Sequence, residues 1–146
     1  VFNLPEKVIM FPKETKFLII DDFPTVRKFL RLNLMKLGYN AVEFAEDGSI
    51  AFQKLTEAHD ATQPFQFVIS DLNMPGLSGL ELLKKCRDDV RFKELPFLML
   101  TAERGQEKVK EAIGLKVSDY LVKPFDEVTL KKKLEIIYAK LSQKAA

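Results

Sequence analysis

This sequence of 146 residues contains very little cysteine or histidine, with one residue of each, Cys86 and His59. A lone cysteine excludes an internal disulfide and is typical of a protein that works in a reducing cytoplasm. We expect Cys86 to lie in a helix without chemical activity. His59 has no nucleophile placed with it in the sequence pattern, so a histidine-based catalytic triad is excluded.

Long apolar runs and a strong charge of one sign are also missing. No stretch approaches the ~18 apolar residues of a membrane-spanning helix, and prolines and charges interrupt positions 1–15, where a signal peptide would be continuously apolar. A formal net charge of +2 gives no support for nucleic-acid binding. The lysine run at 131–133 is interpreted as a solvated helix face, and the alternative is that it helps to dock an acidic partner. These features favour a cytoplasmic protein that binds neither a membrane nor a nucleic acid.

Length and composition fit one globular domain. The chain is 47% hydrophobic and 30% charged, and its length is sufficient to bury a substantial core. Residues 1–15 carry two prolines and no sustained hydrophobic period, so we interpret them as an N-terminal arm with a short extended piece at 8–11. The domain is expected to occupy residues 16–146.

Strands and helices alternate from Lys16 onward, which predicts βαβ units around a parallel sheet. Short apolar runs predict strands at about 16–21, 41–45, 65–70, 97–100 and 120–122. Helical spacing predicts helices that begin near Pro24, Gly48, Leu80 and Glu107 and after the N-cap Asp126. The fold class is therefore α/β, a doubly wound five-stranded parallel sheet with the flavodoxin-like order 2-1-3-4-5.

Three aspartates directly follow two of these apolar strands. Asp21 and Asp22 come after the first strand, and Asp71 comes after the third. The predicted order places these strands side by side, and ligands of such sheets bind outside the carboxyl ends of the strands. Three converging carboxylates repel one another, and a cation with oxygen ligands, such as Mg²⁺, relieves that repulsion. The alternative is that Asp21 or Asp22 only caps the following helix, but three acids at adjacent strand ends favour the cation site.

The order and spacing of four segments resemble a known family. The segments are Ile20-Asp21-Asp22, Asp71-Leu72-Asn73-Met74-Pro75-Gly76-Leu77-Ser78-Gly79, Thr101-Ala102 and Lys123-Pro124-Phe125. Together they are similar to a response-regulator receiver domain, above all to the single-domain chemotaxis regulators that are called CheY-like. The resemblance covers residues 16 to about 141 and implies the (βα)5 receiver fold.

The resemblance assigns roles to the acids. Asp71 would accept a phosphoryl group from a histidine of a partner kinase, since a carboxylate can attack phosphorus. Mg²⁺ would be held by Asp22, Asp71 and the backbone carbonyl of Asn73, while Asp21 would contact it through water. Because Mg²⁺ usually keeps several waters, these few protein ligands suffice.

Other positions of the resemblance surround the phosphoryl group. Lys123 would reach its oxygens as a point charge, and Thr101 would donate a hydrogen bond to it. Tyr120 resembles the family's switch aromatic, while Asn73 and Glu103 would flank the acyl phosphate and affect the access of water. Without the resemblance these positions have ordinary interpretations: a solvated lysine, a helix cap, a packed aromatic and two surface residues.

The expected function is a phosphorylation-controlled switch rather than an enzyme, with self-catalysed phosphoryl transfer and dephosphorylation only. Phosphorylation of Asp71 would draw Thr101 inward, shift Tyr120 and alter a surface formed by the fourth helix, fifth strand and fifth helix. The chemotaxis resemblance implies a histidine kinase as donor and the flagellar motor switch, or another effector protein, as target. It also implies a phosphatase as a further partner and a monomeric state.

Several alternatives stand beside this interpretation. A receiver of a phosphorelay outside chemotaxis would carry the same residues. An aspartyl-phosphate phosphatase usually has an aspartate two residues after its nucleophile, where this chain has Asn73. A flavin module needs a hydroxyl- and glycine-rich loop after the first strand, where this chain has Asp22-Phe23-Pro24, and no P-loop pattern occurs. A receiver that binds constitutively would not need all five key positions.

One region departs from the family pattern. Relatives commonly have Gly-Ala before the fifth strand, whereas residues 115–119 read Leu-Lys-Val-Ser-Asp. Either Lys116 adopts the left-handed conformation in which helices often end, or the helix ends earlier, at Gly114. The Lys123–Pro124 bond is cis in relatives, although X–Pro bonds are mostly trans.

Overall fold

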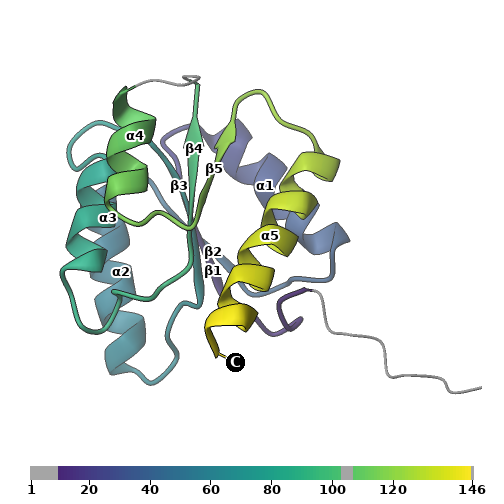
Figure 1. Ribbon diagram of the computed structural model, residues 1–146, viewed down its shortest axis with the longest axis horizontal. Helices are drawn as coiled ribbons and strands as arrows, with labels where there is room; N and C mark the ends of the chain where they lie inside the picture. The colour runs from purple at the N-terminus through teal and green to yellow at the C-terminus, as the bar shows by residue number, and fades with distance from the viewer. Residues whose placement is uncertain (1–9, 103–106, 146) are drawn as a thin grey trace, which may run out of the picture.

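The computed structural model describes residues 10–102 and 107–145, which form a five-stranded parallel sheet between two layers of helices (Figure 1). The strands are β1 (Phe17–Ile20), β2 (Val42–Ala45), β3 (Phe67–Asp71), β4 (Phe97–Thr101) and β5 (Asp119–Val122). The helices are α1 (Pro24–Lys36), α2 (Gly48–Asp60), α3 (Gly79–Arg87), α4 (Glu107–Gly114) and α5 (Glu127–Ala145). The order β2-β1-β3-β4-β5 and the parallel pairing confirm the predicted flavodoxin-like fold. No helix within these residues has the length and apolar character that crossing a membrane requires.

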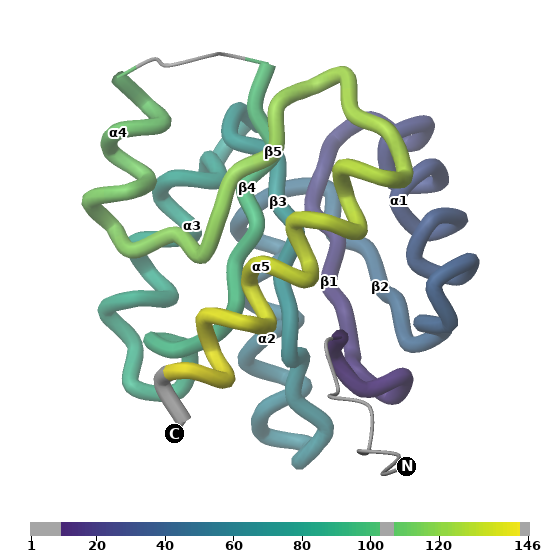
Figure 2. Tube along the Cα trace, turned by 45° about the vertical axis from the view of Figure 1, so that its right-hand side comes forward, coloured from purple at the N-terminus to yellow at the C-terminus, as the bar shows by residue number. Residues whose placement is uncertain are grey.

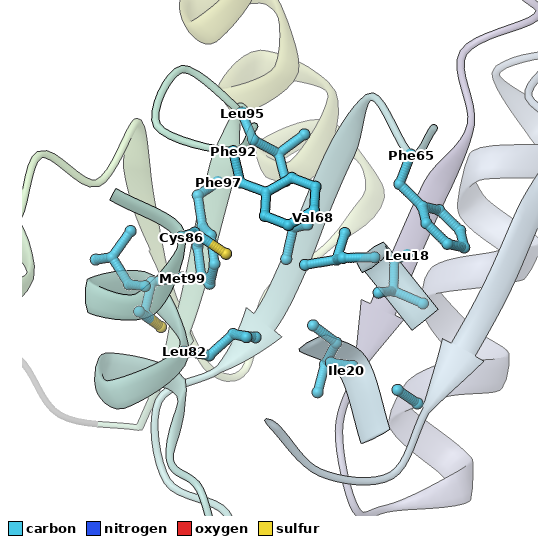
Figure 3. Packing of buried hydrophobic residues seen from close by; sticks show 14 of the residues in the cluster. Leu18, Ile20, Phe65, Val68, Leu82, Cys86, Phe92, Leu95, Phe97 and Met99 are labelled. Atoms are coloured by element: carbon cyan, nitrogen blue, oxygen red, sulfur yellow. The ribbon is translucent and has the colours of Figure 1, made fainter. Parts of the chain in front are cut away.

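Helices α1 and α5 cover one face of the sheet, and α2, α3 and α4 cover the other (Figure 1). The three central strands are therefore buried along their whole length, which explains their continuous apolar runs. Figure 3 shows Leu18, Val68 and Phe97 from these strands in one cluster with Leu82 and Cys86 of α3. Burial raises the pKa of Cys86 to about 12, so its thiol stays protonated, as expected of a structural cysteine.

Two strands extend one residue further than the sequence predicts. Asp71 and Thr101 are the last residues of β3 and β4 rather than the residues that follow these strands. Backbone hydrogen bonds between neighbouring strands cause the extension: the N–H of Leu72 donates to the carbonyl of Leu100 (2.8 Å), and the N–H of Lys123 donates to the carbonyl of Thr101 (2.7 Å). The site residues are thus fixed by the sheet itself.

The turn after α4 combines the two possibilities that the sequence offers. The helix ends at Gly114, and Lys116 has a φ of 64°, in the left-handed region. The N–H of Lys116 donates to the carbonyl of Ile113, and the N–H of Val117 donates to the carbonyl of Ala112, both at 3.0 Å. This is the Schellman pattern of a helix C-terminus, formed here with a lysine at the position that usually belongs to glycine.

Part of the predicted arm lies against the domain, where residues 10–15 run beside the start of β1 (Figure 2). The ring of Phe11 contacts the rings of Phe67 and Tyr138, with centroids 5.2 and 5.1 Å away. The Tyr39 hydroxyl donates a hydrogen bond of 2.8 Å to the carbonyl of Phe11. Half of the expected extended piece lies outside the described residues, and the other half forms no strand. Residues 10–15 therefore add to the core beneath α1 and α5.

Candidate functional site

The carboxyl ends of β1 and β3 bring together three aspartates. Ile20 pairs with Ser70 in the parallel register, so the residues that follow them lie level on neighbouring strands. One oxygen from each of Asp21, Asp22 and Asp71 lies within 4.8 Å of the other two. Asp21 is fully buried, Asp71 is 7% exposed and Asp22 is half-buried. We call this place the acid crevice.

Asp21 has partners for both of its carboxylate oxygens. Oδ1 accepts a hydrogen bond from the backbone N–H of Phe23 (2.9 Å), and Oδ2 lies 3.2 Å from Nζ of Lys123. The guanidinium of Arg27 donates to the Asp21 carbonyl (2.7 Å), which ties the first turn of α1 to the end of β1. Because its oxygens are already occupied, Asp21 suits a supporting role at a cation site better than direct ligation.

Asp22 has a different environment. Its Oδ1 is buried and has no hydrogen-bond partner, and it is the single side-chain atom of this kind in the described part of the chain. Leaving such an oxygen unsatisfied costs about 1–3 kcal/mol. The ligand atoms that the three aspartates offer are all carboxylate oxygens, which hard divalent cations prefer. The residues present therefore fit Mg²⁺, and Asp22 provides an uncommitted ligand atom.

Asp71 lies between an ammonium group and another acid. Its Oδ2 is 3.4 Å from Nζ of Lys123, and its Oδ1 accepts a long hydrogen bond of 3.4 Å from the N–H of Asn73. Burial raises the pKa of Asp71 above its ordinary value, while Lys123 opposes this shift and Asp21 adds to it. The charged carboxylate is thus held in a place where added positive charge stabilises it.

Lys123 and Thr101 lie at the ends of β5 and β4, on the other side of Asp71. Thr101 is 1% exposed, and its carbonyl holds the backbone of Lys123 level with it. The Lys123–Pro124 peptide bond is cis, which agrees with what the family resemblance implies. Lys123 is no ordinary solvated lysine, because its ammonium contacts both Asp21 and Asp71.

The loop after β3 returns directly against Asp71. The N–H of Gly79 donates to the carbonyl of Leu72 at 3.1 Å, and a Cβ at Gly79 would lie only 2.0 Å from the backbone oxygen of Asp71. Glycine is needed here for close approach, because any side chain would push α3 away from β3. At Gly76 glycine is needed for its backbone conformation instead. A side chain would have open space there, but the φ of +73° lies in the region that side chains disfavour.

Tyr120, the expected switch aromatic, is half-buried on β5 and packs against the core beneath α2, α3 and α4. The ammonium of Lys133 lies 5.2 Å from the centre of its ring and 3.2 Å from Oδ1 of Asp119. The sequence interpretation of 131–133 as a solvated face is therefore wrong for Lys133. A run of three lysines does not indicate which side chain packs against a neighbouring strand, as Lys133 does against β5.

Asn73 is exposed, and its side-chain oxygen accepts a hydrogen bond of 2.8 Å from Nζ of Lys108 on α4. Sequence reasoning missed Lys108, because a lysine in an amphipathic helix normally marks only the solvent side. Glu103, the other residue expected to flank the phosphoryl group, lies outside the described residues.

Comparisons with known proteins agree with this geometry. The response regulator receiver domain model matches residues 17–135. The chain is 43% identical over 129 residues to chemotaxis protein CheY-3 of Vibrio cholerae, which covers 88% of this chain and 95% of that protein. The solved chemotaxis response regulator CheY4 of Vibrio cholerae has a TM-score of 0.76 at 37% identity and covers 85% of this chain and 98% of its own. A sensor histidine kinase receiver domain from Pseudomonas aeruginosa, with magnesium coordinated in its active site cleft, has a TM-score of 0.72 at 25% identity, covering 86% and 98%.

Proposed function

The chain belongs to the family of response regulator receiver domains, and we propose that it is a CheY-like phosphoacceptor whose Asp71 receives a phosphoryl group from a histidine kinase. One observation carries this proposal. Asp71 is a buried carboxylate at a strand end, flanked by the Lys123 ammonium and by an Asp22 oxygen without a partner. Such an arrangement combines a nucleophile, a fixed positive charge and a ligand atom for a cation.

Phosphoryl transfer needs positioning and charge neutralisation more than covalent help from the protein. In the proposed step an oxygen of Asp71 attacks the phosphorus of a phosphohistidine. The O–P bond forms while the N–P bond breaks, and the imidazole nitrogen keeps the electron pair and takes up a proton. Lys123, at 3.4 Å, opposes the rise that burial causes in the pKa of Asp71, and its ammonium would meet the phosphoryl oxygens that enter.

A Mg²⁺ ion would be held by Asp22, Asp71 and the backbone carbonyl of Asn73, with Asp21 acting through water. The bound ion supplies positive charge that offsets the acids and the phosphoryl group. The unpartnered Oδ1 of Asp22 supports this assignment, and so does the magnesium in the cleft of the Pseudomonas aeruginosa receiver domain. The protein's own contribution is to keep four oxygen-bearing residues at one edge of the sheet.

We also propose the switch that the sequence suggests. The hydroxyl of Thr101 would donate to the phosphoryl group, Tyr120 would change its orientation, and the face formed by α4, β5 and α5 would bind its partner differently in the two states. Similarity to CheY-3 makes the flagellar motor switch the proposed target and a chemotaxis histidine kinase the proposed donor. The protein would act as a cytoplasmic monomer, with a separate phosphatase as a further partner.

We expect no activity of Asp71 toward other substrates. An aspartyl-phosphate phosphatase usually has a second acid two residues after the nucleophile. Asn73 occupies that position, and its oxygen is held by Lys108. Chemistry at Asp71 is therefore limited to its own phosphorylation and to the hydrolysis of the acyl phosphate.

The test joins donor and target in one experiment. Purified chemotaxis histidine kinase, phosphorylated on its histidine, is mixed with the protein in Mg²⁺ or in a chelator, and transfer is followed on a gel. Binding of motor switch protein is then measured with and without beryllofluoride, a phosphoryl mimic. We expect transfer only with Mg²⁺ and stronger binding with the mimic. Absence of transfer with Mg²⁺ would contradict the donor assignment, and equal binding in both states would contradict the switch.

A further inference from the structure

Lys108 connects α4 to the loop that follows the phosphoacceptor strand. Its ammonium lies 2.8 Å from Oδ1 of Asn73, across 35 positions of the chain. The backbone N–H of Asn73 in turn donates to Oδ1 of Asp71. Figures 1 and 2 show that α4 begins at the end of the sheet where β4 finishes, so this contact joins a helix of the outer layer to the rim of the acid crevice. We call it the Lys108–Asn73 bridge.

The bridge is specific to one of two lysines on the same helix. Lys110 is also exposed on α4, yet it makes no hydrogen bond or ion pair with the described residues, whereas Lys108 is directed onto Asn73. Fixing a lysine side chain costs up to about 2 kcal/mol of rotamer entropy, so an exposed lysine is held only where something attracts it. A single hydrogen bond to a neutral amide gives little net stabilisation, about 1 kcal/mol. We infer that the formal negative charge of the acid crevice supplies further attraction for the Lys108 ammonium.

The charge balance of the crevice shows how the bridge responds to a ligand. Three carboxylates are set against the ammonium of Lys123 and the guanidinium of Arg27, which lies on the Asp21 carbonyl, so the crevice has a formal excess of one negative charge. A divalent cation bound there would turn this excess into a formal excess of one positive charge, which no longer attracts the Lys108 ammonium. Like charges repel, by an amount that falls with their distance and with added salt. Cation binding and the bridge therefore oppose each other.

We propose that Lys108 is a positioning residue that senses the charge of the acid crevice, holding α4 to Asn73 while the crevice is anionic and releasing it when a divalent cation binds. The proposal rests on the cation site of the proposed function and deepens it. It gives the site a direct mechanical connection to α4, which belongs to the proposed output face. Because such coupling is reciprocal, removing the bridge must strengthen cation binding if the cation weakens the bridge.

The test compares Mg²⁺ affinity in wild type, Lys108→Gln and the matched control Lys110→Gln. Each variant removes one lysine charge from the exposed surface of α4. Mg²⁺ is titrated at low salt, and the dissociation constant is taken from NMR shifts of the amides near Asp22 and Asp71. We expect Lys108→Gln to bind Mg²⁺ about two- to fivefold more tightly than wild type, and Lys110→Gln to show less than half of that effect. The gain should shrink as salt is added.

A second readout follows the helix itself. Hydrogen exchange of α4 amides is measured with and without Mg²⁺ in the same three proteins. We expect Mg²⁺ to speed exchange of the hydrogen-bonded amides in the second turn of α4 in wild type and Lys110→Gln, and to leave Lys108→Gln unchanged. Equal Mg²⁺ affinity in both variants, or exchange that ignores Mg²⁺ in wild type, overturns the bridge while leaving the proposed function intact. If Mg²⁺ shifts no amide near Asp22 or Asp71 in any protein, the cation site and the bridge both fail.

Discussion

Nζ of Lys123 lies 3.4 Å from Oδ2 of Asp71 and so pairs the last residue of β3 with the residue that follows β5. The same ammonium lies 3.2 Å from Asp21, so one positive charge is shared by two carboxylates. Asp22 receives no part of it, and its Oδ1 stays without a partner. The protein alone therefore leaves the crevice under-neutralised, which costs stability and prepares the site for a cation and a phosphoryl group.

Replacement of Asp71 by asparagine should stabilise the fold. Burial raises the pKa of Asp71, so the protonated carboxyl suits the folded state better than the carboxylate does. Below the pKa of Asp71 in the unfolded chain, the group is protonated in both states and does not destabilise the fold. As the pH rises through the higher pKa of the folded state, ionisation of Asp71 lowers the free energy of unfolding. At neutral pH without Mg²⁺ we expect Asp71→Asn to raise the free energy of unfolding by about 1–2 kcal/mol.

Urea unfolding with a chelator present measures this difference. The advantage of Asp71→Asn should fade as the pH falls through the raised pKa of folded Asp71, and it should be gone below the pKa of an aspartate in the unfolded chain, about 4. Asp60→Asn, at the exposed end of α2, is the control and should change stability by no more than about 0.5 kcal/mol. An advantage that grows toward acid pH would contradict the direction of the pKa shift.

Replacement of Lys123 by glutamine should have the opposite effect. It leaves Asp21, which is fully buried, and Asp71 without their shared cation. Without Mg²⁺ we expect a loss of about 1–3 kcal/mol in the free energy of unfolding. Saturating Mg²⁺ should recover part of this loss, because the ion replaces the missing positive charge. Lys131→Gln, exposed on α5, should lose little stability and gain nothing extra from Mg²⁺; a Lys123→Gln protein as stable as wild type in the chelator would refute the assignment.

Replacement of Lys116 by glycine should stabilise the turn after α4. Lys116 has a φ of 64°, and a side chain in this region costs energy that glycine avoids. Glycine also loses more chain entropy on folding, so the net gain should be about 0.5–1 kcal/mol, measured as a higher urea midpoint. Lys116→Ala keeps the unfavourable φ and should give no gain. The same turn after α2 has φ of 58° at Thr62, and Thr62→Gly should gain similarly.

Replacement of Gly79 by alanine should damage the site through the backbone. Its new Cβ would lie 2.0 Å from the carbonyl oxygen of Asp71, so either α3 or the end of β3 must move. We expect a loss of about 3 kcal/mol or more in the free energy of unfolding. Gly114→Ala, at the end of α4 with nothing within 4 Å, is the matched control and should be neutral or slightly stabilising. Equal stability of the two variants would show that the loop does not press on Asp71.

The strand order and the meeting of three acids could be predicted, because each depends on short-range sequence patterns. Runs such as Phe17–Ile20 are apolar throughout and must be buried on both faces, which fixes a parallel sheet covered by helices. Once the order places β1 beside β3, the acids at their ends have no other location. The exact strand ends were missed, because the backbone bonds that extend β3 and β4 belong to neighbouring strands.

Contacts made by long side chains could not be predicted. Lys108 and Lys133 both appear in the sequence as ordinary helix-surface lysines, yet one reaches Asn73 and the other lies over Tyr120. Helical periodicity identifies the side of a helix that faces solvent, but it does not say which ammonium returns to the protein. The packing of Phe11 against Phe67 could not be predicted either, because residues 10–15 show no hydrophobic periodicity that indicates which side chains are buried.

The most direct test of the central claim is where a phosphoryl group attaches. Wild type and Asp71→Asn are incubated with acetyl phosphate and Mg²⁺, and intact-mass spectrometry counts the added groups. Borohydride then reduces any acyl phosphate, and peptide mapping locates the reduced aspartate. The account predicts one phosphoryl group on wild type, located at Asp71, and none on Asp71→Asn. Equal phosphorylation of the two proteins, or reduction at another aspartate in wild type, would contradict it.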